Sequence, residues 1–254
     1  MYQVRGWVRL APGEDQRLRD GHLWVYSNEI VESGGPDSSV PAPGGTVGAG
    51  ATVGPGGDFE DGDVVAVEDA SRRRIGTGFV NRASRITVRL LTRGSSETFD
   101  QAALSSRLKR AVARRAHLGL DAVRLVNAEG DLLPGLVVDR YGRVVVIQTR
   151  VLGWERRRDA VVDAVLDAAQ ALVAPTAVVL RNDSLSRKAE GLESYCLVAR
   201  GSLEGPVVVS EGGLDLEVDV LKGQKTGFYI DQRDNRALVL PYVRGKRVLD
   251  CFCY

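Results

Sequence analysis

The chain has 254 residues, 44% of them hydrophobic, which is enough for two domains of about 150 residues or fewer. Its 34 Lys and Arg nearly balance 33 Asp and Glu, which excludes a uniformly basic polyanion binder and confines any nucleic-acid site to a local patch. Because the three cysteines form no disulfide framework and no signal peptide or stretch of about 18 apolar residues is found, we expect a cytoplasmic protein without a membrane segment.

The first 93 residues are expected to form a small β-barrel. Polar and apolar positions alternate around Val4, Trp7 and Val8, and short β-branched stretches recur at 63–68, 75–80 and 86–91. Residues 33–57 hold nine Gly and four Pro. We predict a flexible Gly/Pro-rich insertion there, inside a first domain of residues 1–93.

Residues 94–200 are predicted to form a central α+β domain. Leu104, Leu108 and Val112 follow helical spacing, so a helix is expected over 99–118, and a second helix over 154–173 ends before Pro175. The stretches 122–127, 136–139, 144–150 and 177–182 are typical of strands. The mixed order of helices and strands indicates a compact α+β unit.

Residues 201–254 are expected to begin a third domain. The pattern predicts a hairpin of 214–220 against 226–230, a helix over 231–240 and a strand that runs to Tyr254. A strand buried on both faces needs neighbours that these residues do not supply. We therefore expect the natural protein to be longer, with this chain as its amino-terminal and central part.

Several basic and aromatic residues are candidates for RNA binding. Arginines bind phosphates and aromatic rings stack on bases. We therefore expect RNA to bind at a rim of the barrel and on the outer face of the first helix. The alternative is structural, because Trp24 is also a typical strand residue and an arginine run is as often a solvated turn. The candidates are Arg17, Arg19, His22, Trp24, Arg72, Arg73, Arg74, Lys109 and Arg110.

The turn Gly223-Gln-Lys-Thr-Gly227 leads into a helix that begins with a carboxylate, an amide and a guanidinium. Asp231, Gln232 and Arg233 could together bind a zwitterion, such as the amino-acid end of S-adenosylmethionine. The alternative is that Asp231 caps the helix while Arg233 pairs on the surface. A phosphate-binding loop is excluded, because it requires a glycine where this chain has Gln224.

Three segments resemble a family of PUA-domain-containing methyltransferases of large-subunit ribosomal RNA. Residues 2–93, apart from the insertion, resemble the PUA domain, a small RNA-binding barrel; residues 127–141 and 223–236 resemble the same family. The resemblance implies a PUA-like barrel, a central α+β domain and the start of a Rossmann-like methyltransferase domain. It also implies S-adenosylmethionine as cofactor, held by Gln232, Arg233, Asp231, Lys225 and Phe228, and ribosomal RNA as partner.

The activity that this resemblance implies is methylation of cytosine C5. In that family the catalytic cysteines lie downstream of residue 254, so no catalytic residue is expected within this chain, and Cys251 and Cys253 are interpreted as packed strand residues. Two histidines without a Cys-x-x-Cys pair argue against a metal site. Two alternatives stay open, a non-catalytic RNA-binding protein and a methyltransferase with another target; the oligomeric state, a homodimer included, is also open.

Overall fold

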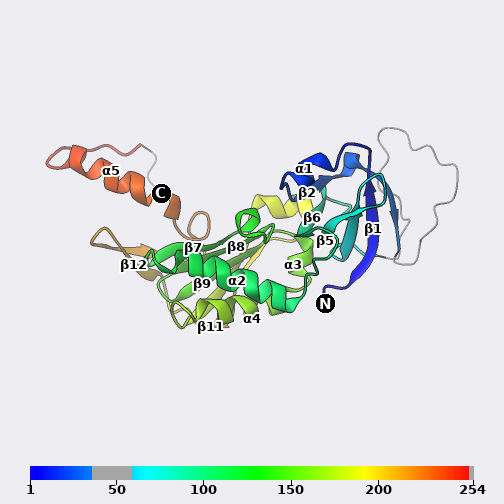
Figure 1. Cartoon of the computed structure of the whole chain (residues 1–254). Coiled ribbons are helices and arrows are strands. Elements are labelled where there is room, and N and C mark those ends of the chain that lie inside the picture. Colours follow the sequence, from blue (N-terminus) through cyan, green and yellow to red (C-terminus); the bar gives the residue numbers. More distant parts are fainter. Residues whose placement is uncertain (36–58, 252–254) are drawn as a thin grey trace.

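The computed structural model describes residues 1–35 and 59–251 (Figure 1). Most of the predicted insertion at 33–57 therefore lies outside the described residues. Its first two residues were assigned wrongly, because Ser33 pairs with Val8 and Gly34 with Trp7 in a strand. Within the described residues, no helix is long and apolar enough to cross a membrane.

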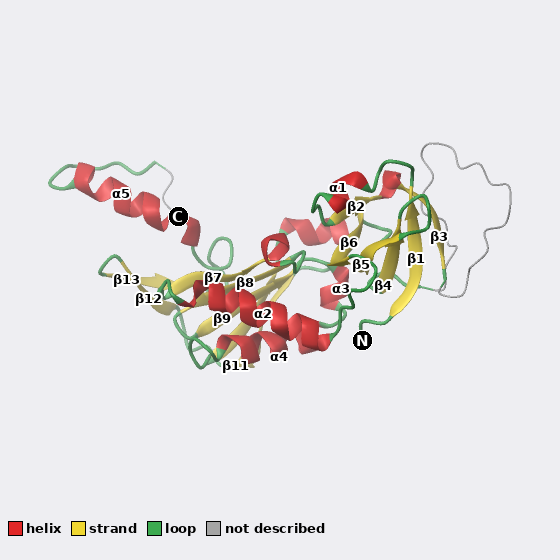
Figure 2. Cartoon of the chain, viewed as in Figure 1, coloured by secondary structure: helices red, strands yellow, loops and turns green. Residues whose placement is uncertain are grey.

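The first unit is one curled six-stranded sheet (Figures 1 and 2). Its core is lined by β-branched and leucine side chains such as Val8, Val67 and Leu90, which confirms the expected PUA-like β unit. The strand order is β2-β6-β5-β4-β1-β3, and a short helix, α1, lies between β1 and β2. The bounds are β1 Val4–Leu10, α1 Gln16–Arg19, β2 Trp24–Tyr26, β3 Ile30–Gly34, β4 Val64–Glu68, β5 Arg74–Val80 and β6 Ile86–Arg93.

The central unit is a five-stranded sheet in the order β11-β10-β9-β8-β7, with helices on one face (Figure 2). The strands predicted from the sequence are all present, and an edge strand that was not predicted, β11, completes the sheet. Most residues of β11 are exposed, so its sequence lacks the apolar alternation of a half-buried strand. The bounds are α2 Gln101–Ala116, β7 Ala122–Asn127, β8 Leu136–Tyr141, β9 Val144–Thr149, β10 Ala177–Asn182 and β11 Tyr195–Gly201.

The single helix predicted at 154–173 is wrong, because the chain forms two helices there, α3 (Leu152–Glu155) and α4 (Arg158–Ala169). The break falls at Arg157, which leaves the helical conformation with φ −116° and ψ 20°. Its guanidinium donates to the carbonyls of Gly62 at 2.8 Å and Met1 at 2.9 Å in the first unit. Arg157, at the break between the two helices, therefore connects the central unit to the first unit.

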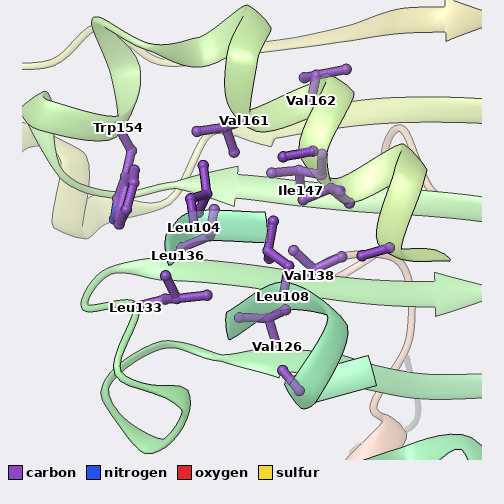
Figure 3. Packing of buried hydrophobic residues seen from close by; sticks show 14 of the residues in the cluster. Leu104, Leu108, Val126, Leu133, Leu136, Val138, Ile147, Trp154, Val161 and Val162 are labelled. Carbon is purple, nitrogen blue, oxygen red and sulfur yellow. The ribbon is translucent and has the colours of Figure 1, made fainter. Parts of the chain in front are cut away.

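A hydrophobic core is shared by both units, and Figure 3 shows the part of it that lies in the central unit. Helices α2 and α4 cover the sheet face that carries Val138 and Ile147, and the same cluster extends to Phe79 of β5. The rings of Trp154 and Phe79 meet edge to face with centroids 4.7 Å apart, and the Trp154 Nε1 donates to the Pro134 carbonyl at 2.7 Å. The first two units therefore pack as one body.

The predicted hairpin of 214–220 against 226–230 is wrong. The hairpin pairs β12 (Val207–Glu211) with β13 (Leu214–Val218). Gly212 and Gly213 both have positive φ, as a two-residue hairpin turn requires, and this local turn sets the register. Residues 226–230 instead form a loop that returns to the central sheet.

Helix α5 (Arg233–Val243) begins close to the predicted position and follows a short 3₁₀ turn at Ile230–Gln232. None of its residues is buried. The strand expected to run to Tyr254 is absent from its described part, residues 248–251, where Leu249 is 86% exposed and Cys251 is also exposed. No strand of the described residues pairs with this segment, so it lacks the neighbours that a buried strand requires. Cys253 lies outside the described residues.

Candidate functional site

One candidate site is a cavity of about 810 Å³ between the central sheet and the loop that follows β13. This volume is within the range of small-molecule sites. The wall from the sheet carries Arg124, Gln148, Arg150 and Arg181, and the wall from the loop runs from Lys222 to Asp231. Five cationic side chains and two carboxylates line the cavity, so its field is positive.

The strand pattern explains why a polar cavity opens on this face. Side chains of a strand alternate between faces, so Val145 and Ile147 of β9 point to the helices, while Val144 and Val146 lie under the hairpin. The next residue on that second face is Gln148, which lines the cavity. The change from valine to polar residues therefore marks where the hairpin cover ends and the cavity begins.

A buried chain of hydrogen bonds attaches the loop to the sheet. The Thr226 hydroxyl donates to Asp139 Oδ2 at 2.6 Å and lies 2.8 Å from the Tyr141 hydroxyl, and Arg124 Nε donates to Asp139 Oδ1 at 2.8 Å. Asp139 and Tyr141 are fully buried. Burial, and secondarily the charge of Asp139, raises the pKa of Tyr141 to about 12, whereas the hydrogen bond to Asp139 raises the pKa of Arg124.

Arg181 fixes the start of the loop. This guanidinium is only 4% exposed and donates to the Val220 carbonyl at 2.9 Å and the Gly223 carbonyl at 3.0 Å. Gly223 cannot be replaced freely, because an added Cβ would lie 2.4 Å from the Gly227 carbonyl and 2.5 Å from the Asp219 carbonyl. The loop is therefore held by the sheet at both Gly223 and Thr226.

The residues predicted to bind the cofactor divide into two groups. Lys225, Phe228 and Asp231 line the cavity, whereas Gln232 and Arg233 do not. Lys225 Nζ is 3.0 Å from Asp231 Oδ2, and this hydrogen bond lowers the pKa of Asp231. The structure therefore brings three of the five residues to one wall.

The other two cofactor candidates contact their own helix. Gln232 Oε1 accepts a hydrogen bond from Asn235 at 2.7 Å, and Arg233 Nε lies 3.2 Å from Asp234 Oδ1. Both side chains carry local, solvent-screened partners that a ligand can displace at low cost. The ammonium, guanidinium and carboxylate groups at this helix start fit the chemistry of an amino-acid zwitterion.

Some of the predicted RNA-binding arginines gather around one carboxylate of the first unit. Asp69 lies 2.8 Å from Arg19 Nη2 and 2.9 Å from Arg73 Nε, so it holds α1 and the β4–β5 turn together. Arg72 is exposed with a φ of 65°, and Arg74 begins β5. Arg17 instead pairs with the buried Glu29. Arg19, Arg72 and Arg73 thus form an exposed basic group on the barrel.

Three of the remaining RNA candidates line a groove between the barrel and α2. Two adjoining hollows of about 520 and 340 Å³ share Leu23, Arg93 and Leu132; Arg110 lines the larger, His22 and Trp24 the smaller. Trp24 Nε1 donates to Glu129 at 2.9 Å, so Trp24 is both a half-buried strand residue and a groove residue. Lys109 lines neither hollow and pairs with Asp167 at 2.8 Å.

Sequence reasoning missed the cationic residues of the central sheet. Arg124 interrupts and Arg181 ends a run of buried apolar residues, and Arg150 directly follows the buried strand β9; these positions were the signal in the sequence. A buried arginine within a strand requires partners, which here are the loop carbonyls and Asp139. Among the described residues no group of three or more His, Cys, Asp or Glu could hold a metal ion.

The chain is similar in sequence to a known domain family and to curated proteins. Residues 8–93 match the PUA-like domain family. The chain is 38% identical over 253 residues to ribosomal RNA large subunit methyltransferase I of Shewanella frigidimarina and 40% identical over 253 residues to that of Shewanella denitrificans. Each alignment covers 97% of this chain and 57% of the relative, so the chain spans a little over half the length of these curated relatives.

Two solved structures share the fold. A protein from Streptococcus mutans assigned as a SAM-dependent methyltransferase superposes with a TM-score of 0.68 at 16% identity, covering 94% of this chain and 54% of that one. A protein assigned as a methyltransferase and solved in complex with SAH gives a TM-score of 0.68 at 16% identity over 94% of this chain and 53% of that one. At this identity the likeness concerns the fold.

Proposed function

We propose that this chain, with its PUA-like domain and its similarity to ribosomal RNA large subunit methyltransferase I, serves the methylation of large-subunit ribosomal RNA by S-adenosylmethionine. The observation that supports this most strongly is 38–40% identity across 97% of the chain, which includes the cavity loop 223–236. A cavity lined mainly by cations and an exposed group of arginines on the barrel are compatible with an RNA substrate.

Within this proposal, the loop wall of the cavity holds the methyl donor. When bound, S-adenosylmethionine supplies a methyl group activated by its sulfonium. Lys225 and Asp231, with Gln232 and Arg233 at the same helix start, would hold the charged amino-acid end, and Phe228 supplies an aromatic surface. The Asp139–Thr226 hydrogen bond attaches this wall to the central sheet.

The RNA would be bound by the first unit and the adjoining helix. Arg19, Arg72 and Arg73 offer cations to phosphates, and the groove that contains His22, Trp24 and Arg110 offers aromatic faces beside cations. We propose cytosine C5 as the methylated position. No side chain of the described residues is assigned a catalytic role.

Nucleoside analysis of ribosomal RNA tests the proposal. Large-subunit RNA is purified from cells in which the gene encoding this chain is deleted, digested and examined by mass spectrometry against the parent strain. We expect one 5-methylcytidine to disappear and to return when the gene is restored. Loss of a different methylated nucleoside would correct the base, and an unchanged set of methylated nucleosides would contradict the proposal.

A further inference from the structure

The sheet wall of the 810 Å³ cavity carries positive charge that the proposed donor site does not use. Arg124 comes from β7, Arg150 directly follows β9 and Arg181 comes from β10, so three strands of the sheet each bring a guanidinium to the cavity. Lys222 faces the same space from the loop. These four cations outnumber the two carboxylates, Asp183 and Asp231, that line the same cavity.

The four cations differ in how far they are neutralised. Arg124 is paired with Asp139, and Arg181 with Asp183 at 3.0 Å. Arg150 donates to Gln148 Oε1, a neutral acceptor, at 3.2 Å. In residues 1–35 and 59–251, neither Arg150 nor Lys222 forms an ion pair with a carboxylate. These two residues therefore retain charge for a ligand.

The position of Lys222 is fixed although its side chain is exposed. Asp219 Oδ1 accepts hydrogen bonds from the backbone N–H groups of Leu221 and Lys222, both at 2.9 Å, and Arg181 holds the carbonyl of Gly223. Arg150 is only partly exposed and lies close enough to Arg124 that burial, followed by this like charge, lowers its pKa. Cations held near each other in this way favour an anionic ligand.

We propose that Arg150 and Lys222 bind the phosphodiester backbone of an RNA strand that enters the cavity beside the loop 223–231. The inference rests on the proposed function, and it assigns the part of the cavity around Arg150 and Lys222 to the RNA substrate. Arginine and lysine are the usual partners of phosphate oxygens. Arg124 and Arg181 add to the field but stay engaged with the protein.

RNA binding measured against salt tests this inference. Fluorescence anisotropy follows a labelled single-stranded RNA of about 12 nucleotides bound to the 254-residue chain, from about 50 to 300 mM salt. The variant R150Q/K222Q should bind roughly tenfold more weakly at about 100 mM salt, and its log–log salt slope should fall by about 1.4, because each single-strand phosphate contributes about 0.7. The charge-retaining variant R150K/K222R should keep the wild-type slope.

The matched control is R143Q/K246Q. Arg143 precedes the start of β9, at the end of the strand opposite to Arg150, and Lys246 follows α5; both are exposed and outside the cavity. This variant removes the same charge and should leave the salt slope unchanged. An equal fall in slope for both double variants would overturn the inference, since it would reflect net charge alone.

The outcomes separate the inference from the function on which it rests. If the wild-type chain binds RNA and R150Q/K222Q binds it with the same affinity and slope, the inference fails while the RNA function stands. If the wild-type chain does not bind RNA at low salt, the RNA function itself fails. If R150Q/K222Q loses affinity for cytidine monophosphate but keeps the RNA salt slope, the cavity takes a free nucleotide and the inference is overturned.

Discussion

The hydroxyl of Thr226 donates a 2.6 Å hydrogen bond to the fully buried carboxylate of Asp139, 87 residues away in the sequence. This bond joins the loop that forms one wall of the cavity to the sheet that forms the other. A hydrogen bond to a buried charge is among the stronger single contacts in a protein, about 1.5–3 kcal/mol. The central sheet therefore fixes the position of the loop that forms the proposed donor wall.

Replacing Thr226 with Val tests this attachment. The variant keeps the side-chain shape but removes the hydroxyl, so we expect the free energy of unfolding to fall by about 1–3 kcal/mol. Amide hydrogen exchange at residues 222–228 should become faster. The control is T226S, which keeps the hydroxyl and should preserve slow exchange. Equal exchange in T226V and wild type would show that the bond does not hold the loop.

Gly223 should be intolerant of a methyl group. In G223A the added Cβ would meet two backbone carbonyls at 2.4 and 2.5 Å, neither of which can move without moving the loop. We expect a loss of stability of about 1–3 kcal/mol in urea unfolding. The matched control is G205A, because a Cβ there meets nothing within 4 Å. Similar unfolding midpoints for the two variants would contradict the close approach at Gly223.

Two buried tyrosines predict a loss of stability at alkaline pH. Burial raises the pKa of Tyr2 and of Tyr141 from 10.0 to about 12. The folded state thus favours the neutral phenol, and stability is full below pH 10 and falls as pH rises toward 12. Urea unfolding should show a shallower alkaline decline in Y141F than in wild type. Parallel declines in the two proteins would contradict the raised pKa of Tyr141.

Glu155 lies in a polar network of the central unit, and we expect this network to lose stability at acid pH. Burial alone would raise its pKa, but hydrogen bonds from Thr149, Tyr195 and Arg187 outweigh burial and lower it from 4.5. The stabilisation is therefore present above pH 4.5 and is lost as pH falls through the lower folded value.

E155Q should lose about 3 kcal/mol near neutral pH, because it leaves the buried Arg187 without its carboxylate. The difference from wild type should shrink below pH 4.5, where wild type begins to protonate. The control is D159N, since Asp159 is 77% exposed and only 3.9 Å from Arg158. A difference between E155Q and wild type that is constant with pH would contradict the ionised state of Glu155.

The basic group on the barrel predicts an RNA-binding effect separate from that of the cavity. Two members of this group, Arg72 and Arg73, are replaced by Ala together with the adjacent Arg74. The variant should bind RNA more weakly, and its salt slope should fall by about 0.7 for each phosphate that is no longer neutralised. Fluorescence anisotropy over the same salt range measures both quantities. Unchanged affinity and slope would place the RNA-binding residues of the first unit elsewhere, with the groove of His22 and Trp24 as the next candidate.

The sequence could predict elements whose pattern is local. The strands at 63–68, 75–80, 86–91 and 177–182 are short runs rich in β-branched residues, and nearly all of their residues are buried. The helix around Leu104 and Leu108 is present because its apolar periodicity matches its buried face. The hairpin was misassigned because Gly212-Gly213 was not read as its turn. The strand to Tyr254 was not found in residues 248–251, since strand formation depends on neighbours rather than on apolar content.

The candidate site was predictable only in part, because its two walls lie far apart in the sequence. Lys225, Phe228 and Asp231 were found from one contiguous segment. Arg124 lies in β7 and Arg150 directly follows β9, and the contact of this sheet with the loop depends on the Asp139–Thr226 and Arg181–Gly223 hydrogen bonds. No local pattern encodes such long-range bonds, although polar residues in otherwise apolar strands indicate that a partner exists.

Photolabelling with the methyl donor tests the central claim most directly. The protein expressed from the gene is irradiated with S-adenosylmethionine that carries a radioactive methyl group, then digested, and the labelled peptide is sequenced. We predict label within residues 223–236, and a marked loss of label in Q232A/R233A while the neighbouring D234N keeps it. Label that lies entirely outside 223–236, or that is equally strong in Q232A/R233A, would contradict the assignment of this wall to the methyl donor.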